Sequence, residues 1–141
     1  MMAEQHGGSC LCGAVTFTVS GALGVASACH CSQCRKQTGL YYASTNVATA
    51  DLKVRGQDNI GWYQSSVEAR RGFCRVCGSA LFWASDDADT ISVMAGLFDD
   101  PGELKIGYHI FCADKGSFYE INDGLPQYPQ SNTPTPVAVT D

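Results

Sequence analysis

The segment Phe73-Cys74-Arg75-Val76-Cys77-Gly78-Ser79 holds two cysteines separated by two residues and followed at once by glycine. A C-x-x-C pair fits a metal site, because its tight turn lets two sulfurs reach one ion. Gly78 completes a knuckle-like turn, since glycine tolerates a left-handed backbone. The segment therefore predicts one half of a metal site.

Two further motifs supply the remaining sulfur donors. Residues i and i+2 of an extended chain project to the same side, so a C-x-C pair also binds one ion. The cysteines fall into a four-sulfur set and a three-sulfur set: Cys10, Cys12, Cys74 and Cys77, then Cys29, Cys31 and Cys34. A closed four-ligand site is structural, whereas three protein ligands and a vacancy are the general form of a catalytic zinc. We therefore expect two zinc ions per chain. Spacing alone leaves open a second partition, in which Cys29 and Cys31 share an ion with Cys74 and Cys77.

Other interpretations of these residues carry less weight. Disulfides are disfavoured without an export signal, and a thioredoxin-like redox pair at Cys74 and Cys77 lacks its βαβ context. Cys112 stands alone and is expected to be a small buried hydrophobe. His30 lies between two cysteines, so on an extended chain it points away from their sulfurs. We expect it to support the metal site or to lie on the surface rather than to bind the ion.

Composition excludes several classes of protein. The 141 residues are 45% hydrophobic and 16% charged, which fits one globular domain. A net charge of −5 gives no general attraction for nucleic acid or an anionic membrane. No apolar run reaches the roughly 18 residues that span a bilayer, and residues 1–8 lack the apolar core of a secretory signal. We therefore expect a cytoplasmic protein with reduced cysteines.

The rest of the chain reads as short strands separated by turn residues, which predicts an all-β fold. The expected strands are residues 14–19, 40–45, 51–54, 60–64, 68–73, 79–84, 90–95, 105–111 and 118–121. Only residues 32–38 look helical, with Ser32 as the cap and Gly39 as the end. Residues 99–102 form a turn. Four of the five prolines follow Leu125, so we expect a zinc domain over residues 1–128 and an extended tail over residues 129–141.

The three cysteine motifs and their neighbours resemble the glutathione-dependent formaldehyde-activating enzyme family, whose domain is also named for the centromere protein CENP-V. The matching stretches include Gly8-Ser9-Cys10-Leu11-Cys12-Gly13, Cys29-His30-Cys31-Ser32-Gln33-Cys34-Arg35-Lys36 and Phe73-Cys74-Arg75-Val76-Cys77-Gly78-Ser79. Gly96-Leu97-Phe98-Asp99, His109-Ile110-Phe111 and Asp123-Gly124-Leu125-Pro126-Gln127 match as well. The resemblance runs from about Gly8 to Tyr128.

The resemblance implies an Mss4-like fold of short antiparallel sheets with a structural zinc on the four-cysteine set and a catalytic zinc on the triplet. It also implies carbon–sulfur lyase activity, the reversible joining of formaldehyde and glutathione as S-(hydroxymethyl)glutathione. In this interpretation an incoming thiol takes the open position and is ionised there. Arg35, Lys36 and His109 are candidate contacts for the substrate. The alternative function is a zinc-stabilised protein-binding module without catalysis.

Three features depart from the family pattern and concern the pocket rather than the metal ligands. Position 112 is cysteine, and Lys115-Gly116-Ser117-Phe118 is looser than the family's common Lys-Ala-x-Trp. Tyr41 and Tyr42 add aromatic bulk after Gly39, near the expected open zinc. We therefore expect this chain to differ from the family in its substrate pocket.

Overall fold

Short runs of β-branched and aromatic residues form the strands, as the all-β prediction requires. The computed structural model describes residues 4–131. In that range the strands are β1 (Gln5–Ser9), β2 (Thr16–Ser20), β3 (Ala26–Cys29), β4 (Tyr42–Ala48), β5 (Leu52–Arg55), β6 (Ile60–Gln64), β7 (Ala69–Cys74), β8 (Ala80–Ser85), β9 (Thr90–Met94) and β10 (Ile106–Ile110). The α-helix among these residues is α1 (Ser32–Thr38), and four single 3-10 turns lie at Thr49–Asp51, Gln57–Asn59, Ala95–Leu97 and Cys112–Asp114. No helix among the described residues is long and apolar enough to cross a membrane.

The chain divides into two compact units. The first comprises Met1–Gly24 and Ser44–Leu104, and the second comprises Val25–Ala43 and Lys105–Asp141. The two metal-binding motif sets divide in the same way, because the four-cysteine set falls in the first unit and the triplet in the second.

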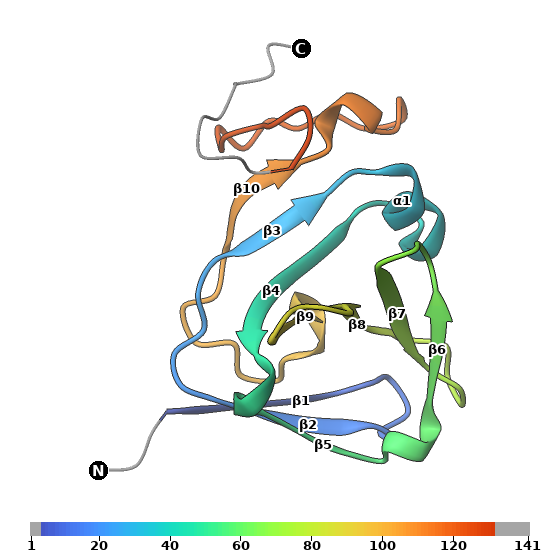
Figure 1. Ribbon diagram of the computed structural model, residues 1–141. Helices are drawn as coiled ribbons and strands as arrows, with labels where there is room; N and C mark the ends of the chain where they lie inside the picture. Colours follow the sequence, from blue (N-terminus) through green and yellow to red (C-terminus); the bar gives the residue numbers. More distant parts are fainter. Residues whose placement is uncertain (1–3, 132–141) are drawn as a thin grey trace. The chain divides into compact units, whose positions relative to one another are not determined.

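A three-stranded antiparallel sheet in the first unit has the order β1-β2-β5 (Figure 1). Phe17 and Val19 of β2 are buried while the alternating threonines are only half-buried, which is the period of a strand with one covered face. Strand β1, QHGGS, was not predicted. A Cβ on Gly8 would lie 2.6 Å from the Phe17 ring and 2.4 Å from the Leu97 carbonyl oxygen, so this strand needs glycine for a close approach.

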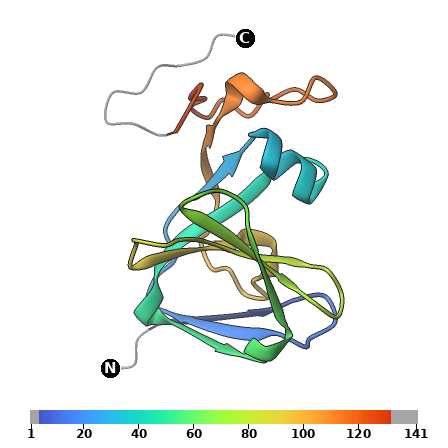
Figure 2. The ribbon, with the colours of Figure 1, turned by 45° about the vertical axis from the view of Figure 1, so that its right-hand side comes forward.

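A second antiparallel arrangement in the first unit joins β4, β9, β8, β7 and β6 in that order (Figure 2). Leu81, Phe82 and Val93 are almost fully buried between the strands. The Phe17 ring meets the Phe82 and Phe98 rings edge to face, at centroid distances of 6.0 and 5.3 Å. The same hydrophobic cluster includes Cys10 and Cys74, so two metal-binding cysteines belong to the core of this unit.

The second unit is built on a parallel pair of strands, β3 and β10. The segment after Leu125 lies along the chain of β10, because the Tyr128 N–H donates to the His109 carbonyl and the His109 N–H donates to the Pro126 carbonyl. Helix α1 follows β3 after two residues, and Gly39 ends it in a left-handed conformation, as predicted.

Two local predictions were wrong, and a further strand was missed. Cys31, not Ser32, caps α1, because the Cys31 sulfur accepts the Cys34 N–H. Residues 118–121 form no strand, since the Tyr119 side chain and main chain bond instead to His30 and Lys115. Strand β3 was missed because it has only four residues, ASAC, and their small side chains do not favour a strand. Residues 132–141 of the expected tail lie outside the described residues.

Candidate metal centres and an active-site pocket

Four cysteine sulfurs in the first unit lie within 4.8 Å of one another. The Cys10 and Cys12 sulfurs are 3.7 Å apart, and the Cys12 and Cys74 sulfurs are 3.8 Å apart. Tetrahedral zinc with Zn–S bonds of about 2.3 Å requires sulfur separations of about 3.8 Å. The spacing and the all-sulfur donor set therefore fit zinc, and the four sulfurs would complete its coordination.

Backbone N–H groups face these sulfurs. The Val15 N–H donates to the Cys10 sulfur and the Cys77 N–H to the Cys74 sulfur, both at 3.4 Å. A hydrogen bond of 3.2 Å from Ser79 to the Cys77 sulfur lowers the pKa of Cys77 to about 5. Gly78 has φ of +83°, the left-handed geometry expected of the knuckle. These contacts favour thiolates, the form that binds a metal.

Three cysteine sulfurs in the second unit form a separate group, also within 4.8 Å of one another. Cys29 ends β3, Cys31 caps α1 and Cys34 lies in the first turn of the helix. Hydrogen bonds with the sulfurs of Cys31 and Cys34, followed by burial, raise the pKa of Cys29, because a thiol that shares its proton with neighbouring sulfurs loses it less readily. A bound cation would reverse that effect. The triplet could thus hold a metal ion and would leave it one ligand short of four.

All eight cysteines are free thiols, which contradicts the disulfide alternative. The sulfurs gather in the two groups counted from the sequence, and the described residues contain no group that mixes them. Cys112 is buried, as expected of a small hydrophobe.

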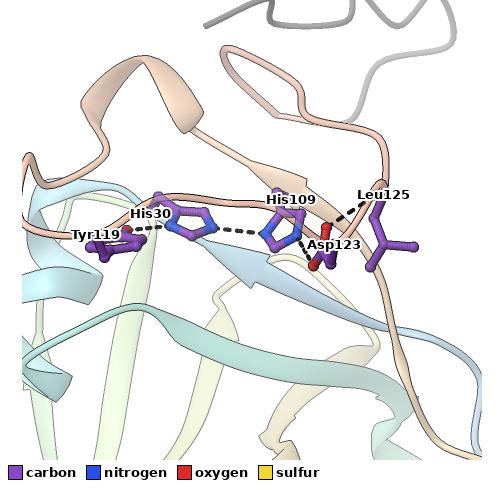
Figure 3. A network of polar contacts seen from close by, with 5 residues as sticks. All are labelled: His30, His109, Tyr119, Asp123 and Leu125. Carbon is purple, nitrogen blue, oxygen red and sulfur yellow. Dashed lines mark hydrogen bonds and ion pairs between the residues drawn. The ribbon is translucent and has the colours of Figure 1, made fainter.

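A chain of hydrogen-bonded polar side chains lies within the second unit (Figure 3). One of its members, His30, lies between Cys29 and Cys31 in the sequence. His30 is fully buried and contacts the Tyr119 hydroxyl through Nδ1. Its Nε2 lies 2.9 Å from Nδ1 of His109, whose Nε2 lies 2.8 Å from the Asp123 carboxylate. The expectation that His30 is not a metal ligand fits this arrangement, and the alternative of a surface position is wrong.

The protonation states of the side chains in this polar chain follow from burial and hydrogen bonding. Burial, followed by the proximity of His109, lowers the pKa of His30 to about 4, so the ring is neutral near pH 7. Partial burial works in the opposite direction at Asp123, but the Leu125 N–H and the His109 ring lower the pKa of that carboxyl. Burial raises the pKa of Tyr119, so its hydroxyl keeps its proton. The polar chain therefore ends in the neutral Tyr119 phenol on one side and in the Asp123 carboxylate on the other.

The polar chain forms part of the wall of a pocket of about 340 Å³, within the range of small-ligand sites. The lining residues are His30, Tyr41, His109, Tyr119, Glu120, Ile121, Asn122 and Asp123. The Tyr41 and Tyr119 rings lie on His30 with centroid distances of 4.9 and 5.5 Å. Aromatic rings and carboxylates therefore dominate the surface that a ligand would meet.

The three residues predicted as substrate contacts lie in different settings. His109 is buried and lines the pocket. Arg35 is half-buried and Lys36 is exposed, both on α1 beyond Cys34, and neither lines the pocket. Sequence reasoning missed Tyr119 and Glu120, which no motif marks. The family resemblance includes Asp123 in one matching segment, but no role was predicted for it. An acidic residue directly before Gly-Leu-Pro is the signal that could have suggested a hydrogen-bond partner for His109.

Comparisons with known proteins found a matching family profile and similar proteins. The profile of the family described as "Glutathione-dependent formaldehyde-activating enzyme" matches residues 5–114. A Schizosaccharomyces pombe protein named an uncharacterized lyase is 28% identical over 121 residues, covering 83% of this chain and 85% of its own length. A Halomonas elongata protein, named provisionally as a glutathione-dependent formaldehyde-activating enzyme, is 40% identical over 87 residues, or 56% of this chain and 55% of the relative.

A solved structure supports the same fold. The crystal structure of a Rhodobacter sphaeroides protein superposes with a TM-score of 0.57 at 29% sequence identity. The match covers 71% of this chain and 98% of the other.

Proposed function

Because the chain belongs to the glutathione-dependent formaldehyde-activating enzyme family, we propose that it is a zinc-dependent carbon–sulfur lyase that joins a small thiol to an aldehyde reversibly. The observation that supports this most strongly is the division of seven sulfurs into a set of four and a set of three. A protein that used zinc only for stability would need no incomplete set.

Each set has its own role in the proposal. Cys10, Cys12, Cys74 and Cys77 would hold a structural zinc, and Cys29, Cys31 and Cys34 would hold the catalytic one. The ion on the triplet would supply a coordination position at which a thiol loses its proton near neutral pH. The Cys34 N–H holds the Cys31 sulfur at 3.4 Å and so fixes its direction at the start of α1.

The reaction adds the thiol across a carbonyl group. The sulfur–carbon bond forms, the carbonyl π bond breaks, and the proton from sulfur ends on the carbonyl oxygen. Glutathione and formaldehyde are the proposed substrates, in keeping with the family description. Holding both reactants in one site would supply most of the rate gain, because the effective molarity of well-oriented partners is very high.

Arg35 offers a contact for a substrate carboxylate. Its Nε is buried and has no hydrogen-bond partner among the described residues, which leaves a donor for a ligand. Lys36 is exposed beside it and would add attraction for the same group. We place the activity in residues 1–128, with residues 129–141 as a tail, and propose the cytoplasm as its compartment.

The test is exchange spectroscopy of glutathione, formaldehyde and S-(hydroxymethyl)glutathione at equilibrium, with zinc-loaded protein. The wild-type protein should accelerate the exchange, and Cys31→Ser should return it to the uncatalysed rate. Cys112→Ala is the matched control, because it removes a buried thiol of the same unit that belongs to neither group. Acceleration that survives in Cys31→Ser would refute the proposal, as would its absence from the wild-type protein.

A further inference from the structure

The described sheets end in the edge strands β1, β5, β6 and β10, which differ in how they are protected from pairing with another chain. An edge strand presents unpaired N–H and C=O groups, and proteins guard it with charges, short length or a covering segment. Strand β5 has four residues and exposes Lys53 and Arg55. Strand β1 is bridged at Gly8 by Phe98, and residues 126–128 lie along β10. Each of these three edges is therefore guarded.

Strand β6 lacks such protection and lies beyond β7 at the end of its sheet (Figure 1). Its residues, IGWYQ, include no charged side chain and no proline. Trp62 and Tyr63 are 37% and 65% exposed. The nearest cation in contact with the strand is Arg70 of β7, whose guanidinium lies over the Trp62 ring at 4.2 Å from its centre. The edge of β6 is thus neutral and aromatic.

Hydrogen bonds just beyond each end of β6 show which of its backbone groups face β7. At one end the Arg75 N–H donates to the Asn59 carbonyl, and at the other end the Ser65 N–H donates to the Ala69 carbonyl. Bonded and non-bonded residue pairs alternate in an antiparallel ladder, so every second residue from position 59 to position 65 bonds to β7. The intervening residues turn their backbone groups to the open edge: Ile60, Trp62 and Gln64.

Most of these outward groups are available to a partner. The Ile60 N–H already donates to the Gln57 carbonyl, so this residue offers its carbonyl alone. Apart from the ladder with β7, no backbone hydrogen bond within residues 4–131 involves Trp62 or Gln64. The edge therefore offers two N–H groups and three C=O groups to an incoming strand.

A second copy of β6 running antiparallel complements these groups. When Trp62 lies opposite Trp62 of the second copy, the two residues can exchange both of their backbone hydrogen bonds. In the same register, the Gln64 N–H of each copy faces the Ile60 carbonyl of the other. The available donors of one copy therefore all meet acceptors on the other.

The side chains fit the same register, because Tyr63 of one copy then lies opposite Gly61 of the other. The strand pair β6–β7 already combines glycine with an aromatic ring twice. A Cβ on Gly61 would lie 2.5 Å from the Phe73 ring, and one on Gly72 would lie 3.0 Å from the Trp62 ring. Aromatic side chains stabilise a sheet by covering glycine on a neighbouring strand. Tyr63 of a second copy would extend this pattern across the edge.

Charge favours a second copy over a charged peptide. Two β6 strands bring no like charges together and bury no charge, because neither strand carries one. A peptide with acidic or basic side chains at the facing positions would find no opposite charge on β6. The neutral occupant that complements this edge in both hydrogen bonds and side chains is β6 itself.

We propose that the protein forms a symmetric dimer in which β6 of one copy pairs antiparallel with β6 of the other, with Trp62 at the two-fold axis. The pairing joins the β6 edges of two sheets and covers Trp62 and Tyr63. The inference goes beyond the proposed function, since β6 contains none of the cysteines of either metal group.

Sedimentation equilibrium of the zinc-loaded full chain over a range of concentrations tests the dimer. The wild-type mass should rise from one chain to two. Gln64→Pro removes an N–H that faces the edge and leaves the ladder with β7 intact, a position at which an edge strand tolerates proline. It should raise the dissociation constant of the dimer about tenfold or more, because the symmetric contact loses one hydrogen bond from each copy. Circular dichroism would show that the variant is folded.

Tyr63→Lys provides a second variant that retains every backbone N–H. It places a charge opposite Gly61 and should also raise the dissociation constant about tenfold or more. Val67→Lys is the matched control, because it adds the same charge at a 93% exposed residue that follows the strand. The control should dimerise as the wild type does. If Gln64→Pro does not fold, Tyr63→Lys and its control decide the question.

Amide hydrogen exchange followed by NMR tests the register. The Trp62 and Gln64 amides should exchange at least about tenfold more slowly when the protein concentration is raised into the dimer range. The Tyr63 amide bonds to β7 in either state and is the internal reference. A wild-type protein with the mass of one chain at every concentration would overturn the proposal. A dimer that survives both variants, or one that Val67→Lys weakens as much as Tyr63→Lys, would overturn it as well.

Discussion

The two cysteine groups share a chemistry but differ in how the fold supports them. In the four-cysteine group, Cys10 and Cys74 are 3% and 0% exposed and belong to the hydrophobic core of their unit. Cys12 of the same group is exposed. In the three-cysteine group, Cys34 is buried and Cys29 and Cys31 are partly buried, but none of the three belongs to that hydrophobic cluster. The difference teaches that a four-sulfur metal site can form part of a hydrophobic core, whereas the three-sulfur group of this protein lies outside that core.

The largest expected effect comes from removing a cysteine of the four-cysteine group. Cys74→Ser should unfold the first unit, because binding of a structural zinc contributes about 10–16 kcal/mol that is coupled to folding. Circular dichroism and urea denaturation would measure the loss. Cys31→Ser, the same chemical change in the other group, is the control. A folded Cys74→Ser protein with wild-type stability would remove the distinction between the groups.

The second prediction concerns the metal content of the incomplete group. Cys31→Ser should keep its fold and lose one of the two expected zinc ions, since two sulfurs hold zinc far less well than three. Elemental analysis after gel filtration would give the stoichiometry. Retention of both ions in this variant would show that Cys31 is not a ligand.

A smaller effect is expected from the polar chain of His30, His109, Tyr119 and Asp123 in the second unit. His109→Phe should lower the free energy of unfolding by about 1–3 kcal/mol, because it leaves the buried Nε2 donor of His30 without an acceptor. Asp123→Asn should cost less, since its amide oxygen can still accept from His109. Urea denaturation of both variants would compare them. If both variants lose equally little free energy of unfolding, water must accept the hydrogen bond from Nε2 of His30, and the prediction is wrong.

The smallest effect concerns His6 in the first unit. His6 donates through Nδ1 to the Asp100 carbonyl and through Nε2 to the Glu4 carboxylate, both at 2.8 Å. The carbonyl, followed by Glu4, raises the pKa of the ring against the opposing effect of burial. A raised folded pKa means that the folded protein binds the extra proton, so this stabilisation is present below the unfolded pKa of about 6.5 and is lost as the pH rises through the folded value. His6→Gln should therefore destabilise the protein by up to about 1 kcal/mol at about pH 6 and less at about pH 9. A difference that grows with pH would contradict this sign.

The sequence predicted the parts of this protein that local chemistry determines. The cysteine spacings indicated the two sulfur groups, and Gly39 marked the end of α1 where the structure has it. Most strands were found because alternation and turn residues are local signals. The miss at β1 depends on distant partners, because this strand pairs with β2 and a side chain at Gly8 would collide with Phe17 and Leu97.

The pocket was the least predictable part for the same reason. Tyr119 and Asp123 reach His30 and His109 across 89 and 14 residues of chain. No periodicity or spacing brings such residues together. Their roles became visible only when the hydrogen bonds and the burial of His30 were known.

The central claim is that one metal position in this chain is saturated by protein sulfur and the other is not. Cobalt substitution followed by titration with glutathione tests it most directly, because the visible spectrum of cobalt reports its ligands. We predict two cobalt ions per chain, of which one changes its spectrum on adding one equivalent of the thiol and the other does not. A single bound ion, or two ions that both ignore the thiol, would contradict the claim.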